Sequence, residues 1–297
     1  MNVAVIAHSG KTFGGGLQEL RERLHDAGIA DPFWAEVPKS RKAPAQVKRA
    51  LEAGAELIFV WGGDGMVQRC VDAAAGSGAE LAIIPAGTAN LFASNLGIPK
   101  DIAQAVATGL GGERRKIDLG NFNGERFAVM AGAGFDAAMI RDSGKLKDRI
   151  GRAAYVLSGS SNLKMKPFDA RIEVDGSPWF KGKATCILIG NVGELFAGFV
   201  AFDQARPDDG RLEVAVVTAD GVIDWTRMIA RARAGSVTKS PFVQTTQAAS
   251  VKAKLGRKTL YELDGGDRTK VKKFKVEVEP AAVSVCVPRR QSEMSTA

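Results

Sequence analysis

A glycine-rich turn, Gly62-Gly63-Asp64-Gly65, directly follows the apolar run Glu56–Trp61. Glycine allows positive φ angles and lets the backbone approach a phosphate closely, where a Cβ would obstruct it. Asp64 adds a carboxylate that could orient a water molecule or reach Mg²⁺. The pattern favours phosphate binding at the end of a buried strand, although a strand-to-helix turn could require the same glycines for its geometry alone.

Two other loops carry residues of the same kind. Residues 85–90 (PAGTAN) follow the apolar run Leu81–Ile84, and Ser9-Gly10-Lys11 follows the first apolar run of the chain. Thr88 could donate its hydroxyl to a phosphate, and Asn90 could either cap a helix or contact the ligand. Because the carboxyl ends of parallel strands lie at one edge of a sheet, the three loops should border one crevice. Together they predict a nucleotide site.

The elements that must position these loops alternate between strand and helix. Continuous apolar strands alternating with helices are typical of a parallel sheet covered on both faces. We therefore expect an α/β N-terminal domain over residues 1–120, Rossmann-like and three-layered, with a mostly parallel sheet. The expected strands are residues 2–7, 33–37, 56–61 and 81–84, and the expected helices are residues 17–27, 45–53, 67–75 and 89–96.

After about residue 120 the pattern changes to short strand-like runs separated by Gly, Pro, Asn or Asp. This predicts a mainly antiparallel, β-sandwich-like second domain over residues 121–279, with helices near residues 145–163 and 224–234. A last strand within about residues 280–290 could pack back on the first domain. The expected strands are residues 127–130, 170–174, 184–189, 212–217, 251–255, 259–263 and 273–278.

Composition narrows the classes of protein. The 297 residues contain no apolar run long enough to cross a bilayer, and their two histidines and three separated cysteines offer no paired metal-ligand spacing. We expect a cytoplasmic protein. The net charge of +8 favours anionic partners such as nucleotides or an acidic membrane surface. Nucleic acid is not favoured, because the charges are scattered and there is no basic platform rich in aromatic residues.

The order of the motifs resembles the diacylglycerol kinase catalytic family, in particular its bacterial soluble lipid kinases. The resemblance covers most of the chain: HSGK at 8–11, GGDG at 62–65, PAGTAN at 85–90, residues 117–137, GRAAYVLSG at 151–159, ARPDDGRLEV at 205–214 and LDGG at 263–266. It implies an ATP-binding first domain and a lipid-substrate second domain. The implied reaction is ATP-dependent phosphorylation of a hydroxyl of diacylglycerol or a related lipid, a step of phospholipid biosynthesis.

The resemblance also implies site residues. Nucleotide contacts fall on Ser9, Gly10, Gly62, Gly63, Asp64, Gly65, Met66, Thr88 and Asn90, and Ser40 is the candidate hydroxyl after the second strand. Residues 206–212 match a loop that holds a structural Mg²⁺ in bacterial members. Asp209 would supply its carboxylate, and Arg206 and Arg211 would supply carbonyl oxygens, a ligand set that suits a hard cation. A simple turn is the alternative for this Pro-Asp-Asp-Gly segment.

Three positions depart from the family pattern. Met66 stands where threonine is usual, Leu91 stands where a carboxylate is often found, and Gly266 replaces the glutamate of a DGE motif linked to activation of the acceptor hydroxyl. If the chain is active, Asp264 or Asp267 must accept the proton. Asp118, with Asp64, could hold Mg²⁺ through water. Asp136 lies in a family motif, with a turn carboxylate as the alternative.

The sequence is compatible with several binding partners and with two other functions. A lipid acceptor implies peripheral contact with an anionic inner-membrane surface. The clusters at residues 145–149 and 164–166 are candidate contacts, unless they are simply solvated helix faces. A homodimer is a further expectation. The rival functions are a soluble-substrate kinase of the NAD kinase type and a catalytically impaired protein that binds nucleotide or lipid.

Overall fold

The computed structural model describes residues 1–134, 167–196, 199–220, 224 and 240–289. The chain divides into two compact units. Unit 1 comprises residues 1–119 and 280–297, and unit 2 comprises residues 120–279. The strands β5 (Glu113–Phe122) and β16 (Gly266–Val287) contribute residues to both units.

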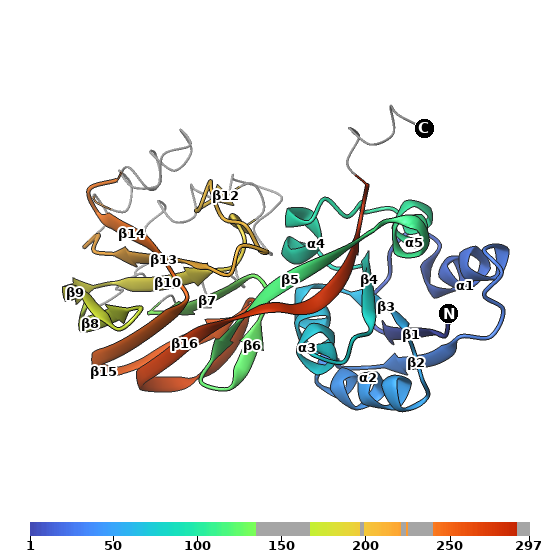
Figure 1. Cartoon of the computed structure of the whole chain (residues 1–297), viewed down its shortest axis with the longest axis horizontal. Coiled ribbons are helices and arrows are strands. Elements are labelled where there is room, and N and C mark those ends of the chain that lie inside the picture. The colour runs from blue at the N-terminus through green and yellow to red at the C-terminus, as the bar shows by residue number, and fades with distance from the viewer. Residues whose placement is uncertain (135–166, 197–198, 221–223, 225–239, 290–297) are drawn as a thin grey trace. The chain divides into compact units, whose positions relative to one another are not determined.

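Unit 1 is built on a parallel sheet in the order β16-β4-β3-β1-β2 (Figure 1). Its strands β1 (Val3–His8), β3 (Leu57–Gly62) and β4 (Glu80–Pro85) are almost entirely buried. β2 (Phe33–Val37) forms one edge beside β1. The end of β16 pairs in parallel with β4 through Val285 and Leu81.

Helices cover both faces of this sheet. The helices α1 (Gly16–Asp26) and α5 (Ile102–Gly111) supply Leu20, Leu24, Ile102 and Val106 to a core that also contains every second residue of β3. On the other face, α2 (Ala43–Glu52) contacts β1, and α3 (Asp64–Ala74) contacts β3. The short helices η1 (Ser40–Lys42) and α4 (Leu91–Asn95) follow β2 and β4. The three-layer α/β prediction is confirmed.

Unit 2 is a mainly antiparallel, sandwich-like arrangement of two sheet regions. One region has the order β14 (Val243–Ala248), β13 (Leu212–Val217), β10 (Cys186–Gly190), β7 (Met130–Ala133) and β15 (Ser250–Leu263). The other joins β9 (Ser177–Ala184), β8 (Phe168–Val174), β15 and β16. The short strands β6 (Glu125–Phe127), β11 (Glu194–Phe196) and β12 (Phe199–Val200) complete the described elements.

The strand β15 belongs to both sheet regions. Its residues 251–255 pair with β8 and its residues 261–263 pair with β7, and its pairing with β16 shifts register between Lys254 and Thr259. The inward side chains of the two regions form one core, which includes Ile172, Ala253 and Phe274 from one side and Ile189 and Val214 from the other. The predicted β-rich second domain is therefore confirmed. Apart from Asp224, its predicted helices lie outside the described residues.

Several expected strands have different limits in the structure. Residues 127–130 are not one strand, because β6 ends at Phe127 and β7 begins at Met130. The backbone N–H groups of residues 128–130 bind the Asp264 carboxylate instead. Conversely, the runs 251–255 and 259–263 form the single strand β15, and 273–278 and 283–287 are joined in β16.

Candidate functional site

The two glycine turns at the carboxyl ends of β3 and β4 touch through their backbones. A Cβ on Gly87 would lie 2.4 Å from the Cα of Gly63, and one on Gly63 would lie 3.0 Å from the Cα of Gly87. The Ala86 N–H also donates to the Gly62 carbonyl at 3.0 Å. Glycine is therefore required at both positions by close backbone approach. The two turns therefore lie side by side at the carboxyl ends of β3 and β4.

Asn90 holds the second turn together from inside. It adopts a left-handed conformation with φ 52°, which asparagine tolerates better than most residues. Its Oδ1 accepts from the Gly87 N–H at 2.8 Å, and its Nδ2 donates to the carbonyls of Gly87 and Pro85 at 2.9 and 3.3 Å. Asn90 precedes α4 but makes no side-chain capping bond. Its geometry supports turn stabilisation, while the exposed Thr88 is free to face a ligand.

Asp64 links the first turn to the second. Its Oδ1 accepts from the Phe92 N–H at 3.4 Å. Burial raises the pKa of the Asp64 carboxyl, and the nearby N–H groups of Phe92, Leu91 and Asn90 oppose that shift in part. Asp64 also begins α3, whose N-terminal N–H groups favour negative charge. The following Gly65 is exposed, and a Cβ there would meet nothing within 4 Å, so a phosphate can approach this backbone.

Met66 does not face the candidate phosphate side. Its side chain is 2% exposed. It packs under Gly62, where an added Cβ would lie 2.5 Å from the Met66 Cβ. Its N–H donates to the Gly63 carbonyl at 2.8 Å. Met66 thus offers a ligand no side-chain group, which corrects its inclusion among the nucleotide contacts; it fills the space below the turn.

The loops that follow β1 and β2 lie at the same sheet edge as the two glycine turns. The Ser9 N–H donates to the Val37 carbonyl at 3.0 Å, and the Gly10 N–H donates to His8 Nδ1 at 3.1 Å. Trp61 ties β3 to this loop because its Nε1 donates to the Lys11 carbonyl at 3.1 Å. Ser40 begins η1, which contacts α3. Unit 1 therefore brings Ser9, Gly10 and Ser40 to the edge that carries both glycine turns.

Asp264 of unit 2 is held by the backbone. Its Oδ2 accepts from the Ala128 N–H at 2.8 Å, and its Oδ1 accepts from the N–H groups of Val129 and Met130 at 2.9 and 2.8 Å. The side chain is 8% exposed. Three such donors hold the carboxylate in place. These contacts give Asp264 a structural role, and its assignment as a base stays a prediction.

Asp118 is also committed to a structural contact. It is 3% exposed, and its Oδ1 accepts from the Ala281 N–H at 2.7 Å. Ala281 has φ 51°, so the carboxylate supports a strained residue of β16. The water-mediated Mg²⁺ role expected for Asp118 stays a prediction.

Glu262 is the residue that the sequence analysis missed. It lies in β15 directly opposite Gly132 of β7 and Asp267 of β16, and it is fully buried. Its Oε2 accepts from the Gly265 N–H at 3.0 Å, while its Oε1 has no hydrogen-bond partner among the described residues. Burial, followed by the charge of Asp264, raises the pKa of Glu262 to about 8. The available signal was an acidic residue two positions before Asp264, within the expected strand 259–263.

Arg268 occupies the space beside Gly266. Its Nη1 donates to the Gly266 carbonyl at 2.9 Å, and its Nε donates to the two carboxylate oxygens of Glu125 at 3.0 and 2.9 Å. An added Cβ on Gly266 would lie 2.7 Å from Arg268 Nη1. Gly266, where the family resemblance implies a glutamate, is therefore covered by the Arg268 guanidinium group. Asp267 remains exposed next to it.

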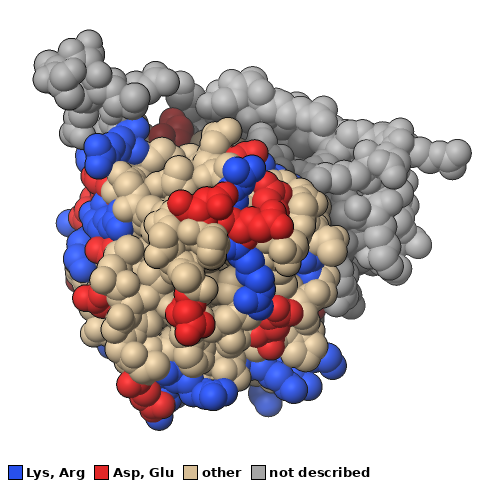
Figure 2. All heavy atoms as spheres, turned by 90° about the vertical axis from the view of Figure 1, so that its right-hand side faces the viewer, with Lys and Arg blue, Asp and Glu red and all other residues tan. Residues whose placement is uncertain are grey.

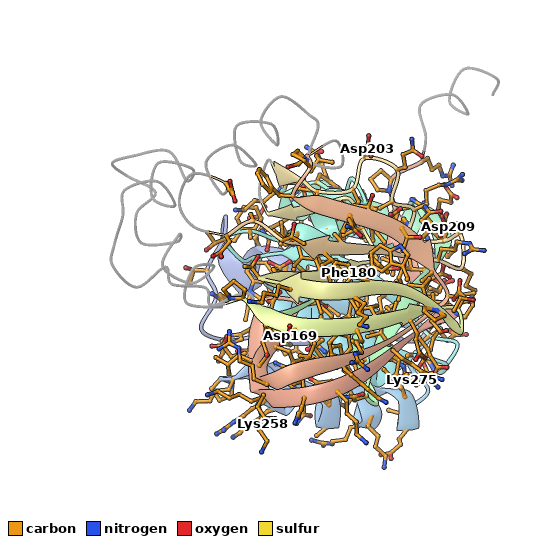
Figure 3. The ribbon with its side chains drawn as sticks, turned by 90° about the vertical axis from the view of Figure 1, so that its left-hand side faces the viewer. Asp169, Phe180, Asp203, Asp209, Lys258 and Lys275 are labelled. Carbon is orange, nitrogen blue, oxygen red and sulfur yellow. The ribbon has the colours of Figure 1, made fainter. Side chains whose placement is uncertain are left out.

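The candidate Mg²⁺ loop precedes β13. Asp209 Oδ1 accepts from the Arg211 N–H at 3.0 Å, an arrangement typical of an Asx turn. Burial raises the pKa of Glu213, and the charges of Asp209 and Asp203 add to the shift, so these carboxylates repel one another. Figure 3 shows Asp203 and Asp209 toward the same corner of unit 2. Repelling carboxylates are compatible with a hard cation, although the described residues contain no cluster of three or more metal-ligating side chains.

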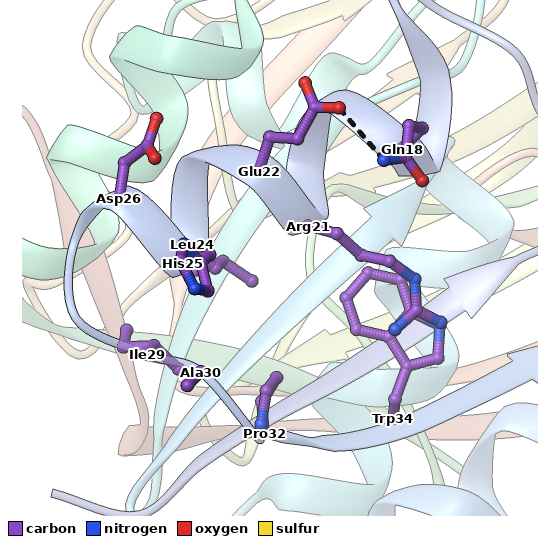
Figure 4. A pocket seen from close by; sticks show the side chains of 10 residues that line it. All are labelled: Gln18, Arg21, Glu22, Leu24, His25, Asp26, Ile29, Ala30, Pro32 and Trp34. Atoms are coloured by element: carbon purple, nitrogen blue, oxygen red, sulfur yellow. Dashed lines mark hydrogen bonds between the residues drawn. The ribbon is translucent and has the colours of Figure 1, made fainter.

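Two other features stand apart from these turns. A pocket of about 300 Å³ lies along α1 and the segment before β2 (Figure 4), with the Arg21 guanidinium 3.6 Å from the Trp34 ring centre. It includes residues that precede β2, and therefore reaches the amino edge of the sheet, opposite to the glycine turns. Asp136 and the basic clusters at 145–149 and 164–166 lie outside the described residues.

Comparison with known families matches both units. The diacylglycerol kinase catalytic domain matches residues 2–122, and the YegS C-terminal NAD kinase beta sandwich-like domain matches residues 129–287. The chain belongs to the diacylglycerol kinase family. Its family membership supports a lipid kinase enzyme. In the part of the chain that the structure describes, no helix is long and apolar enough to cross a membrane.

Individual relatives agree with this assignment. A diacylglycerol kinase of Staphylococcus carnosus is 32% identical over 240 residues, which cover 79% of this chain and 78% of the relative. A YegS-like lipid kinase of Pseudomonas aeruginosa is 38% identical over 58% of this chain and 57% of its own. The crystal structure of a diacylglycerol kinase from Bacillus anthracis shares the fold, with a TM-score of 0.77, 21% identity and coverage of 98% of both chains. An NAD kinase from Archaeoglobus fulgidus is a more distant fold relative, with a TM-score of 0.55, 11% identity and coverage of 96% of this chain and 93% of that one.

Proposed function

We propose that this protein transfers the γ-phosphate of ATP to a hydroxyl of diacylglycerol or a closely related membrane lipid. The observation that carries the proposal is the backbone contact between Gly63 and Gly87, which places two phosphate-type turns side by side at the sheet edge. Exposed Gly65 and Thr88 then offer an N–H group and a hydroxyl to the phosphates. Family membership supplies the lipid as the acceptor class.

The contacts expected for ATP come from unit 1. The N-terminus of α3 stabilises phosphate charge, and Ser9, Gly10 and Ser40 border the same edge. Mg²⁺ bound with ATP would neutralise charge on the phosphate oxygens, with Asp64 as the nearest proposed carboxylate. A separate structural Mg²⁺ would take oxygen ligands from Asp209, Arg206 and Arg211 and relieve repulsion around Glu213.

Asp267 is our proposed proton acceptor. Asp264 is engaged by three backbone donors, whereas Asp267 is exposed beside the turn. Phosphoryl transfer depends more on alignment and charge neutralisation than on a strong base, so an exposed carboxylate is sufficient. We expect Asp267→Asn to lower kcat at least about tenfold while stability and ATP affinity stay unchanged. Unchanged kcat would remove Asp267 from the mechanism.

A direct assay tests the reaction. The full chain is incubated with labelled ATP and Mg²⁺, separately with diacylglycerol, a total membrane-lipid extract and NAD, and the products are identified by mass spectrometry. Phosphorylated diacylglycerol, or another phosphorylated lipid from the extract, is the expected result. Phosphorylation of NAD alone, or ATP binding without transfer to any acceptor, would overturn the proposal. The proposed location is cytoplasmic, with reversible contact at the inner membrane surface, where the acceptor resides.

A further inference from the structure

The outer face of one sheet region in unit 2 carries a row of basic residues in register. Lys181 of β9 pairs with Arg171 of β8, Arg171 pairs with Lys254 of β15, and Lys254 pairs with Lys273 of β16. All four side chains are exposed, and the residues that alternate with them on β8 and β15, such as Ile172 and Ala253, are buried in the core. We call these four residues the basic ladder. With strands about 4.8 Å apart, it spans about 14 Å.

The basic ladder differs from the neighbouring row on the same face. In that row Glu173 of β8 pairs with Lys252 of β15, and Lys275 of β16 forms an ion pair with Glu277 at 2.6 Å. Within the described part of the chain, no acidic side chain forms an ion pair with a ladder residue. Like charges directly opposite on adjacent strands are destabilising. Among the described residues, the ladder is therefore a row of four cations that form no ion pair, with the carboxylates of Asp169 and Glu173 on either side of Arg171 on the same face of β8.

The surface around the ladder is a broad sheet face. Figure 3 looks onto this side of unit 2, where β9 with Phe180, β8 with Asp169, and then β15 and β16 lie one beside the next. By contrast, the face of unit 1 in Figure 2 shows acidic and basic side chains interspersed. On unit 2, the four cations of the basic ladder lie in one row across the sheet face.

We propose that the basic ladder is a docking surface for an anionic phospholipid bilayer. A row of exposed cations on a broad sheet face can contact many headgroups at once, and each Lys or Arg near such a surface adds to the attraction. Single-stranded nucleic acid is a poorer match, because its usual binding surfaces add stacking aromatic side chains and the ladder row contains none. The inference rests on the proposed function for its biological setting, since a lipid acceptor must be reached in a membrane.

The test measures vesicle binding and not catalysis. The full chain is sedimented with vesicles of phosphatidylcholine alone or mixed with phosphatidylglycerol, at low and high salt. The ladder variant carries Lys181→Gln, Arg171→Gln, Lys254→Gln and Lys273→Gln. The matched control carries Arg23→Gln, Lys48→Gln, Lys100→Gln and Lys116→Gln, which remove one arginine and three lysines from exposed positions of unit 1.

We expect the wild-type chain and the control to bind the anionic vesicles at low salt and to lose binding at high salt. The ladder variant should bind the anionic vesicles at least about tenfold more weakly than the wild-type chain. Its Tm should be unchanged or higher, because repulsion between like charges is removed. Equal binding by the ladder and control variants would overturn the inference, as would binding that is independent of phosphatidylglycerol. Stronger, ladder-dependent binding to single-stranded DNA would overturn it in favour of a nucleic-acid surface.

A second measurement separates this inference from the proposed function. Kinase activity of the ladder variant is assayed on diacylglycerol in uncharged detergent micelles, where bilayer charge has no role. Activity equal to wild type there, together with lost vesicle binding, supports the docking role. If the wild-type chain has no kinase activity but binds anionic vesicles through the ladder, the proposed function fails and the docking surface stands. If the ladder variant is active and still binds the vesicles, the docking inference is wrong and the proposed function stands.

Discussion

The turns of unit 1 and the turn around Asp264 in unit 2 are both tight and rich in glycine, but different forces hold them. The unit 1 turns depend on close backbone packing at Gly63 and Gly87 and on the amide of Asn90. The unit 2 turn depends on charge, through Asp264 on three N–H groups, Arg268 on Glu125, and the buried carboxyl of Glu262. The unit 1 turns should therefore be sensitive to side-chain size, and the turn around Asp264 should be sensitive to the ionisation of its carboxyl groups.

The largest effect is expected from Gly87→Val. The new Cβ would lie 2.4 Å from the Gly63 Cα, so the two phosphate turns must separate. We expect ATP affinity to fall at least about 100-fold and stability to fall by about 1–3 kcal/mol, as for other overpacked sites. Titration calorimetry with ATP and thermal unfolding measure the two effects. Gly111→Ala is the control, because its Cβ meets nothing within 4 Å; ATP affinity of Gly87→Val near wild type would contradict the contact.

The next largest effect, on the free energy of unfolding, is expected from Asp264→Asn. It removes the charge that three backbone N–H groups satisfy, and an amide can accept with only one oxygen. Hydrogen bonds to charged groups contribute about 1.5–3 kcal/mol each, so we expect a loss of about 3 kcal/mol in the free energy of unfolding. Urea denaturation measures it. Asp267→Asn, at an exposed position, should stay within about 0.5 kcal/mol. Equal losses in the two variants would show that the backbone contacts to Asp264 contribute nothing.

Glu262→Gln should change how stability depends on pH. The pKa of Glu262 is about 8 in the folded protein, against 4.5 for an ordinary glutamate, so the native state holds the extra proton between these values. The contribution of the protonated Glu262 carboxyl to the free energy of unfolding is complete below about pH 4.5. This contribution decreases by up to about 1.4 kcal/mol per pH unit and is lost as the pH rises through about 8. Glutamine keeps an acceptor for Gly265 but cannot ionise. Denaturation midpoints measured across this range should fall less steeply in the variant, and parallel curves would refute the buried, protonated carboxyl.

The smallest effect is expected from Gly266→Glu. The new side chain must displace the Arg268 guanidinium, which Glu125 and the Gly266 carbonyl hold in place, so we expect the free energy of unfolding to fall by about 1 kcal/mol. Restoring the family carboxylate should raise kcat a few-fold if its absence limits proton removal. Steady-state kinetics with diacylglycerol measures this. A variant with no gain in kcat would show that the remaining groups already suffice.

The strands and helices of unit 1 could be predicted from the sequence because the hydrophobic pattern of each segment is contained in a few consecutive residues. The expected strand at residues 56–61 is β3, and the expected helix at 67–75 is α3, extended back to Asp64. The glycine turns were found for the same reason, since their chemistry is contained in a few consecutive residues. The helix α5 was not foreseen, although its Asp101 N-cap accepts from Gln104 at 2.9 Å.

The unit 2 features depend on pairing between distant segments. The contact of Asp264 with residues 128–130 spans more than a hundred positions, and the burial of Glu262 requires the register between β15 and β7. The basic ladder likewise exists only because four strands align in one register. A one-residue slip of β8 would place Arg171 on the core side, so composition alone could not reveal these sites.

The strand β16 sets an order of completion during synthesis. Its last residues pair with β4 at Ser284 and Val285, and its earlier residues pair with β15 of unit 2. Because β16 follows the other strands of unit 2 along the chain, the sheet of unit 1 lacks this strand until the residues of unit 2 have been synthesised. Unit 1 is therefore begun before unit 2 and closed after it, and until then β4 presents an unpaired edge to which other strands could pair.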